Sequence, residues 1–233
     1  MSSGNRSSSS LKILCVADHV DPLVYSTRAH ERFSEIDLVL SAGDLQMKYL
    51  GFIASSLNKP VVFVFGNHNL EELERFERRL MPPSEADHPS FSSAHRYGST
   101  YADGKVVRVD GLLIAGLGGS MRYNNGAHQF TEFQMAMRMV RLIPRLLWNR
   151  IVHGRYVDIL LTHAAPRGIH DRTDKCHIGF KSFRWFMRRF KPRYLLHGHI
   201  HLYDPNEPRV TRYFQTDVIN VYDHYVLEYN DTL

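Results

Sequence analysis

Short, continuous apolar runs alternate with longer, more polar segments in the first part of the chain. The runs are LKILCVA at 11–17, DLVLSAG at 37–43, PVVFVFG at 60–66 and, further along, YVDILLTHA at 156–164. Runs of this length without polar alternation are typical of strands buried on both faces, and helix-length segments separate the first three. The pattern predicts an α/β fold in which parallel strands are joined by right-handed crossovers.

The remaining chain predicts paired strands and one long helix. The segments KVVRVD and LLIAGLGG flank Asp110-Gly111, a dipeptide typical of a tight hairpin turn. Residues 131–148 have the pattern of a helix that is interrupted or kinked at Pro144. The last β-rich segments, VTRYFQT, DVINVY and HYVLEY, are separated by short polar turns and predict an antiparallel finish.

The sequence predicts one domain and two irregular stretches. Residues 1–10, MSSGNRSSSS, are Ser-rich and polar, so they predict a disordered tail that cannot bury enough surface to offset its chain entropy. Residues 81–104 are rich in Pro, Ser, Asp and His and indicate an excursion within the domain, not a linker. The single domain is therefore predicted to span 11–233.

Composition narrows the class of protein without identifying a ligand. The 233 residues are 43% hydrophobic and 23% charged, a balance ordinary for a soluble globular domain. No apolar run is long enough to cross a bilayer and no secretory signal is visible, so we expect a cytoplasmic protein without a membrane partner. Cys15 and Cys176 lie far apart and are expected to be reduced thiols without a catalytic role.

The net charge of +5 weakly favours phosphate-bearing partners. Cations and aromatic residues alternate in KSFRWFMRRFKPR, at 181–193, which is compatible with RNA binding. An amphipathic helix with Phe183, Phe186, Met187 and Phe190 towards the core is the preferred interpretation. Nucleic acid is therefore possible but unsupported, and nothing in the sequence indicates an oligomeric state.

Five short polar motifs stand at or just after predicted strand ends. They are Asp18, Gly43-Asp44, Gly66-Asn67-His68-Asn69, Thr162-His163-Ala164 and Gly198-His199-Ile200-His201. Ligands of open α/β sheets gather at the carboxyl ends of the strands, so these motifs can converge on one crevice. Each motif alone is weak, because such dipeptides are usually turns and buried histidines are usually structural. All five in this order are a strong indication of a functional site.

The order of the motifs resembles the calcineurin-like metallophosphoesterase family. The family pattern is Asp-x-His, Gly-Asp, Gly-Asn-His-Asp/Glu, a lone His and Gly-His-x-His. The last four match here in order and spacing, with Asn69 at the Asp/Glu position. The resemblance covers the chain from Leu11 to about Glu228. It implies a four-layer α-β-β-α sandwich of two mixed β-sheets flanked by helices. It also implies two divalent metal ions, Mn, Fe, Zn or Mg, at one edge of the sheets.

The resemblance also implies a role for each matching residue. Asp44 would bridge the two ions, Asp18 and His201 would hold the first, and the second would be held by Asn67, His163 and His199. Carboxylate, amide and imidazole ligands suit these ions, and the lack of thiolate ligands argues against a structural zinc site. Such a metal pair lowers the pKa of a bound water to about 7, which creates a nucleophile for phosphorus. Off the metals, His68 would act as the catalytic histidine that stabilises the phosphate or protonates the leaving oxygen.

The first motif departs from the family pattern. It reads Asp18-His19-Val20-Asp21, so Val20 stands where the family has a histidine ligand. Asp21 offers a carboxylate that could reach the first metal directly or through water, whereas His19 could do so only if the loop were shifted by one residue. The alternative is that Asp21 before Pro22 simply starts a turn, which would leave the first metal one protein ligand short.

Two arginines are candidate substrate-binding residues. Arg122 follows the flexible GLGG stretch and could face a substrate phosphate, and Arg167 could line the rim after His163; an ordinary turn and an ordinary loop are the alternatives. The predicted function is metal-dependent hydrolysis of phosphomonoesters or phosphodiesters by a metal-activated water. A nuclease or RNA-processing phosphoesterase would use the same site, and a catalytically impaired metal-binding scaffold is supported only by Val20.

Overall fold

A computed structural model describes residues 10–73, 76, 95–96, 98–204 and 206–230. The predicted tail, apart from its last residue, and most of the predicted 81–104 excursion lie outside the described residues. The assignment of 11–233 to one domain stays a prediction.

The first sheet contains the early apolar runs. Its strands lie in the order β14-β1-β2-β3-β5-β4, and the four central strands are parallel. The parallel strands are β1 (Leu11–Ala17), β2 (Leu38–Ser41), β3 (Val61–Phe63) and β5 (Ser99–Tyr101). The antiparallel edges are β14 (Asp223–Tyr229) and β4 (His95–Arg96), and two helices, α1 (Ala29–Arg32) and α2 (Met47–Leu57), pack beside the sheet.

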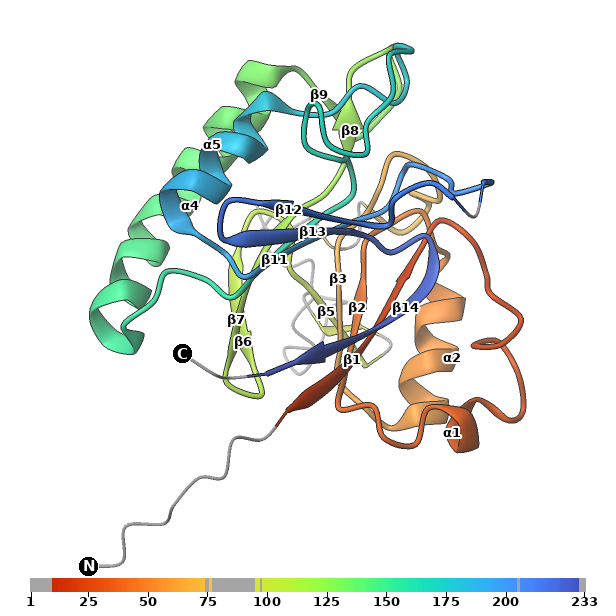
Figure 1. The fold of residues 1–233 in the computed structure, drawn as a ribbon. Coiled ribbons are helices and arrows are strands. Elements are labelled where there is room, and N and C mark those ends of the chain that lie inside the picture. The colour runs from red at the N-terminus through yellow and green to blue at the C-terminus, as the bar shows by residue number, and fades with distance from the viewer. Residues whose placement is uncertain (1–9, 74–75, 77–94, 97, 205, 231–233) are drawn as a thin grey trace, which may run out of the picture.

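The second sheet is built in the same way from the later strands. Its order is β12-β13-β11-β10-β7-β6, with antiparallel edges around four parallel strands. The strands are β6 (Val106–Val109), β7 (Leu112–Leu117), β10 (Ile159–Thr162), β11 (Tyr194–His197), β12 (Val210–Tyr213) and β13 (Thr216–Asn220). Two helices, α4 (Glu132–His153) and α5 (Lys181–Phe190), cover its outer face, and a small sheet pairs β8 (Ser120–Met121) with β9 (Gln129–Phe130) (Figure 1).

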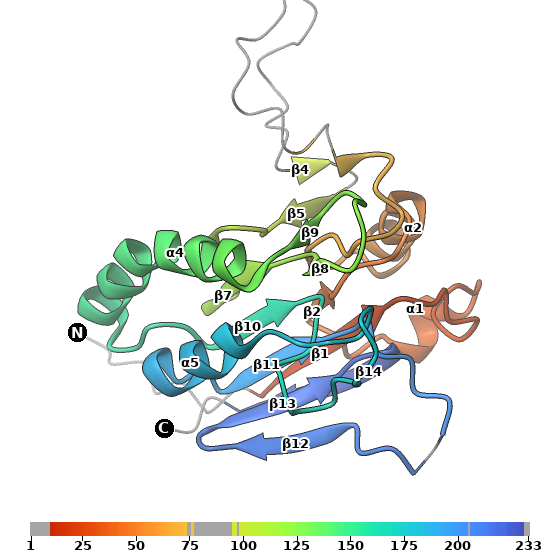
Figure 2. The same cartoon turned by 90° about the horizontal axis from the view of Figure 1, so that it is seen from above.

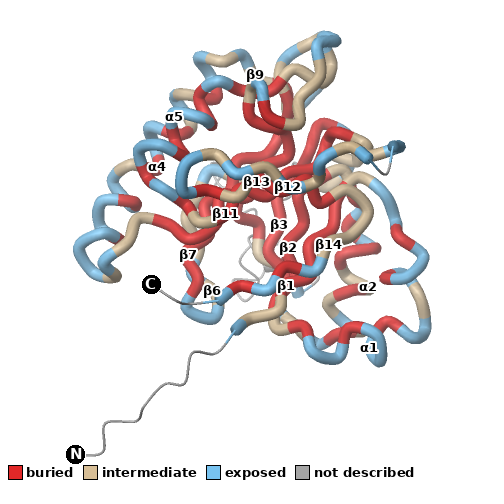
Figure 3. Tube along the Cα trace, in the orientation of Figure 1, coloured by how far each residue is buried: buried red, intermediate tan, exposed pale blue. Residues whose placement is uncertain are grey.

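Three apolar clusters define four layers, which confirms the predicted α-β-β-α sandwich of two mixed sheets. One cluster lies between the sheets and includes Ile13, Leu40, Ile114 and Leu161. A second lies between the first sheet and the helices α1 and α2, and a third lies between the second sheet and the helices α4 and α5. Figure 2 shows the two sheets stacked between the helices, and Figure 3 shows the buried strands inside. The strands read as unbroken apolar runs because both of their faces are covered.

The local predictions are mostly confirmed. β6 and β7 form the predicted hairpin around Asp110 and Gly111, which both have positive φ, as a type I′ turn requires. The antiparallel finish is split between the sheets, because β12 pairs with β13 while β14 crosses over to β1. That choice of partner depends on which sheet edge is open. The pattern of apolar residues in a strand does not determine it.

The predicted long helix is present, and Pro144 does not interrupt it. α4 begins at a capping box formed by Thr131 and Gln134 and ends at Gly154, whose φ of 72° is left-handed. Pro144 is exposed, so water can satisfy the carbonyl that loses its hydrogen bond to the missing amide. None of the helices in the described part of the chain is both long and apolar enough to span a bilayer.

Candidate metal centre

Glycines bring the strand-end loops into close contact. Gly43 and Gly66 follow β2 and β3, and Gly198 follows β11. A Cβ on Gly66 would overlap the Asp44 carboxylate and the His163 ring, and a Cβ on Gly198 would overlap the Asp18 carboxylate. These positions therefore need glycine because the functional side chains pass where a Cβ would stand.

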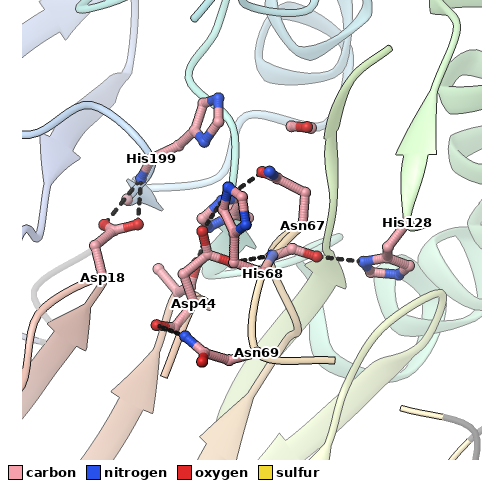
Figure 4. Close-up of polar contacts among 12 residues, drawn as sticks. Asp18, Asp44, Asn67, His68, Asn69, His128 and His199 are labelled. Carbon is pink, nitrogen blue, oxygen red and sulfur yellow. Dashed lines mark hydrogen bonds and ion pairs between the residues drawn. The ribbon is translucent and has the colours of Figure 1, made fainter. Parts of the chain in front are cut away.

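Three residues that are distant in sequence converge at this edge. One ligand atom each from Asp44, His163 and His199 lies within 4.8 Å of the others. Asn67 joins them, since its Oδ1 is 3.2 Å from Nε2 of His163, which is also 3.4 Å from Oδ2 of Asp44 (Figure 4). His163 is fully buried, and Asn67 and His199 are nearly so. The structure thus brings together Asp44, predicted to bridge the ions, and the three residues predicted to hold the second metal.

The hydrogen bonds of His163 show that these residues fit a cation. Its Nδ1 lies 2.8 Å from the carbonyl oxygen of Ala42, and because a carbonyl only accepts, Nδ1 carries the proton. In the neutral imidazole Nε2 is then an acceptor, yet it faces the Asn67 and Asp44 oxygens, which are also acceptors. Such convergence of acceptors is satisfied either by a second proton on His163 or by a metal ion, and the carbonyl partner is typical of a metal-ligating histidine.

The electrostatics of His163 and Asp44 agree with this geometry. Burial alone would lower the pKa of His163, but the Asp44 carboxylate outweighs it and raises that pKa to about 9. Burial likewise opposes ionisation of Asp44, but the charge and hydrogen bond of His163 hold its pKa well below the usual range. The side chains therefore form a site that holds one positive charge, which a divalent ion can replace.

His199 links the second-metal residues to Asp18. Its backbone amide donates to both Asp18 oxygens, at 3.0 and 2.9 Å, and its Nε2 lies 2.8 Å from the Cys176 carbonyl. Nε2 therefore carries the proton, which leaves Nδ1 with a free lone pair. Burial and the nearby His163 charge lower the pKa of His199 to about 3, while burial raises the pKa of Asp18 to about 7.

The loop that carries His68 is fixed on Asp44. The His68 amide donates to Oδ1 of Asp44 at 2.7 Å, and Nδ2 of Asn69 donates to the Asp44 carbonyl at 2.9 Å (Figure 4). The His68 side chain itself is exposed. His68 thus combines a fixed backbone with a side chain that is open to solvent.

The first-metal side is assembled less completely. His201 does not belong to the three-residue cluster; its Nδ1 lies 2.7 Å from the Tyr203 hydroxyl, and its ring packs 4.8 Å from that of Tyr222. Val20 is 39% exposed, and His19 pairs with Asp223. Asp18 is therefore the member of this half that the structure ties directly to the cluster, through His199.

Asp21 has partners that account for its carboxylate. Oδ1 accepts from the Leu23 amide at 2.7 Å, and Oδ2 lies 2.5 Å from Nδ1 of His224. The Val24 and Tyr25 amides donate to the Asp21 carbonyl. These are the contacts of the turn alternative, and ligation of a metal by Asp21 stays a prediction.

The two candidate arginines contact neighbouring loops. Nη2 of Arg122 lies 3.2 Å from Oε1 of Gln134 at the start of α4, and Nη1 of Arg167 lies 3.5 Å from Asp171. Neither contact points to the metal cluster, and phosphate binding by either residue stays a prediction.

Sequence reasoning missed the residues that support the Asn67 loop. Tyr123 accepts from Nδ2 of Asn67 at 3.3 Å. The side chain of His128 is buried; its Nδ1 lies 2.7 Å from the Gly66 carbonyl and its Nε2 3.5 Å from Asp103. Asp103 in turn pairs with Arg138 of α4. No local motif marks these residues, because each acts through a contact distant in sequence.

Comparison with known proteins agrees with the fold and the motifs. A family model described as calcineurin-like phosphoesterase matches residues 11–203. One solved structure has a TM-score of 0.64 at 12% identity, covering 94% of this chain and 95% of its own. TT1561 of Thermus thermophilus has a TM-score of 0.59 at 12% identity, covering 95% of this chain and 99% of its own. None of the curated proteins matches in sequence, and at these identities the structural matches show the fold alone.

Proposed function

This chain belongs to the calcineurin-like phosphoesterase family, and we propose that it hydrolyses phosphomonoesters or phosphodiesters at a site for two divalent metal ions. The family implies metal-dependent hydrolysis of a phosphoester. Beyond this, we propose that two ions bind side by side and that each residue has the role given below. The observation that carries it is the convergence of Asp44, His163 and His199 within 4.8 Å, with Asn67 against His163.

The residues divide into two ligand sets that share Asp44. Asn67, His163 and His199 would hold one ion, and Asp18 with His201 would hold the other. Oxygen and imidazole donors of this kind suit Mn, Fe, Zn or Mg. When bound, such ions bind phosphate oxygens and lower the pKa of water to about 7, so that a nucleophile is available at neutral pH.

The chain's own residues supply orientation and a proton. The Ala42 carbonyl holds the His163 ring in one tautomer, and the Cys176 carbonyl does the same for His199. His68 is exposed beside Asp44, and the bond from its amide to the Asp44 carboxylate positions it. Its imidazole can therefore hydrogen-bond a phosphate oxygen and donate a proton to the leaving oxygen.

The test uses protein stripped of metal and then given Mn, Fe, Zn or Mg in turn. Turnover of an aryl phosphomonoester or an aryl phosphodiester is expected with at least one metal and none without. His68→Ala should bind metal normally and lower kcat by about 10²- to 10⁴-fold, the usual contribution of an acid–base residue. His30 is also an exposed histidine and lies on α1. His30→Ala therefore serves as the matched control and should be as active as the wild type.

Two outcomes would contradict the proposal. Folded protein that takes up metal but turns over neither ester with any metal would be a non-catalytic scaffold. Equal activity of His68→Ala and His30→Ala would remove His68 from the reaction while leaving the metal site in place.

A further inference from the structure

The outer face of α4 exposes an unusual number of large apolar side chains. Its inner face buries Met135, Met139, Leu142 and Leu146 against the second sheet. The outer face nevertheless carries seven more apolar residues in the open: Phe133, Met137, Val140, Leu147, Trp148, Ile151 and Val152. Ile151 is 79% exposed and Phe133 is 73% exposed. A sheet-covering helix normally presents polar residues to water, so this face indicates contact with something apolar.

The same surface is strongly basic. Of the chain's 29 Lys and Arg and 24 Asp and Glu, α4 and α5 hold eight and one, so the rest of the chain carries 21 and 23. The single carboxylate is Glu132, which accepts from the backbone amides of Lys181 and Ser182 at the start of α5. The two helices therefore carry a net charge of +7 against −2 for the rest of the chain, and in the described part of the chain Arg138 is the one of these cations that pairs with a carboxylate off the helices, that of Asp103.

The two helices form one continuous surface. They contact each other and lie on the outer face of the second sheet, on the opposite side of the molecule from α1 and α2 (Figure 2). The exposed positions of α5 are Lys181, Arg184, Trp185, Arg188 and Arg189. Trp148 and Trp185, 56% and 42% exposed, are the only tryptophans of the chain.

We propose that the outer face of α4 and α5 binds the surface of an anionic lipid bilayer, with both helices lying in the plane of the headgroups. Such helices place apolar and tryptophan side chains at the headgroup boundary while their cations contact anionic lipids. Arginine can extend its guanidinium to phosphate while its stem stays among apolar groups. The surface does not cross the bilayer, and its binding is independent of the metal centre and of the proposed hydrolysis.

Other occupants satisfy only part of the surface. A second copy of the chain would cover the apolar residues but would bring two identical basic patches together, because a two-fold interface joins the same patch twice. A nucleic acid would match the cations but leave Phe133, Leu147 and Ile151 in water. The apolar side chains stand on the convex surface of a helix of about 33 Å, and a flat bilayer can meet all of them at once.

The two tryptophans make the experiment direct. Metal-free protein is mixed with large vesicles of phosphatidylcholine alone or of phosphatidylcholine with phosphatidylglycerol, and binding is measured by sedimentation. The expected result is binding to the anionic vesicles, with a blue shift of tryptophan fluorescence and protection from acrylamide quenching. Binding should weaken at high salt, because screening reduces attraction to the lipid charge.

Paired variants locate the surface. Leu147→Ser with Ile151→Ser, and separately Arg141→Glu with Arg145→Glu, should each weaken binding to anionic vesicles by roughly tenfold or more. All four positions are exposed, and folding is checked by circular dichroism. Val226→Ser on β14 and Lys48→Glu on α2, also exposed and on the other sheet's side, should bind as the wild type does.

Several results would overturn the proposal. These are no binding of the wild type to anionic vesicles, equal binding to neutral ones, or unchanged binding of the α4 variants. A blue shift at high protein concentration without lipid, together with a dimer mass, would assign the face to a second copy. A fluorescence change with polyglutamate but not with vesicles would assign it to an acidic protein partner.

Discussion

The two halves of the candidate metal centre differ in how far the protein alone assembles them. On the better-formed side, Nε2 of His163 lies within hydrogen-bonding distance of Asn67 and ion-pairing distance of Asp44. A ligand atom of His199 lies within 4.8 Å of those of Asp44 and His163. On the other side, His201 contacts Tyr203, and the exposed Val20 stands where the family pattern has a histidine.

The difference follows from the supports beneath each half. The Asn67 half rests on strand ends, on glycines that allow close approach, and on the buried His128–Asp103–Arg138 contacts behind Gly66. The other half depends on the loop after β1 and the loop after His199, where His19, Val20 and Tyr203 are exposed and His201 is half-buried. We therefore expect the half containing Asn67 to bind its ion more tightly.

The largest effect should come from breaking the better-formed half. His163→Asn removes a buried ligand and is expected to lower activity by about a thousandfold or more, because a metal supplies several kcal/mol of charge stabilisation. Elemental analysis should show loss of bound metal. His170→Gln is the matched control, since the His170 ring contacts His197 and Thr211 instead of the cluster. Equal metal content in the two variants would contradict the assignment.

The next effect tests the support behind Gly66. Asp103 is 8% exposed and pairs with Arg138, so Asp103→Asn should lower the free energy of unfolding by about 3 kcal/mol. Asp217→Asn, in a more exposed pair with Arg212, should cost less than about 1 kcal/mol. Urea denaturation at pH 7 measures both, and equal losses would show that the buried pair is not special.

The Asp103 effect should also depend on pH with a defined sign. Burial opposes its ionisation, but Arg138 and His128 outweigh burial and hold the pKa of Asp103 well below its usual value. Its stabilisation is therefore complete above the unfolded-state pKa of about 3.9 and is lost as pH falls through the folded-state pKa. The gap between wild type and Asp103→Asn should stay constant at neutral pH and narrow only in strong acid.

A substitution in the poorer half should add an interaction. Val20→His would place an imidazole where the family pattern has one, and it should raise the affinity for the more weakly bound ion roughly tenfold. The free energy of unfolding should change little because position 20 is 39% exposed. Metal titration by calorimetry measures this, with Val20→Ala as the control. An unchanged affinity for the more weakly bound ion would mean that position 20 faces away from the metal.

The smallest effect separates the two interpretations of Asp21. Asp21→Asn should cost about 1 kcal/mol of folding free energy, because it weakens the bonds to Leu23 and His224. Metal stoichiometry should not change if the residue serves only the turn. Loss of one ion would instead assign Asp21 to the first metal.

Much of the fold and part of the centre could be predicted from the sequence. Runs such as 11–17 and 60–66 identified buried parallel strands, and the motifs after them placed Asp44, Asn67, His163 and His199 at one edge. This succeeded because strand burial and glycine turns have local patterns. The membrane expectation drawn from sequence considered only spanning segments, so it gave no weight to the exposed residues of α4.

By itself the sequence determined which residue types follow each buried strand. It also determined that a valine stands in the first motif. Only the tertiary structure decided that His128 supports Gly66, that Asp21 meets His224, and that the apolar outer face of α4 lies beside the cations of α5. The reason is physical, since burial periodicity and turns are local properties of the chain. Contacts between residues tens or hundreds of positions apart depend on how the layers pack.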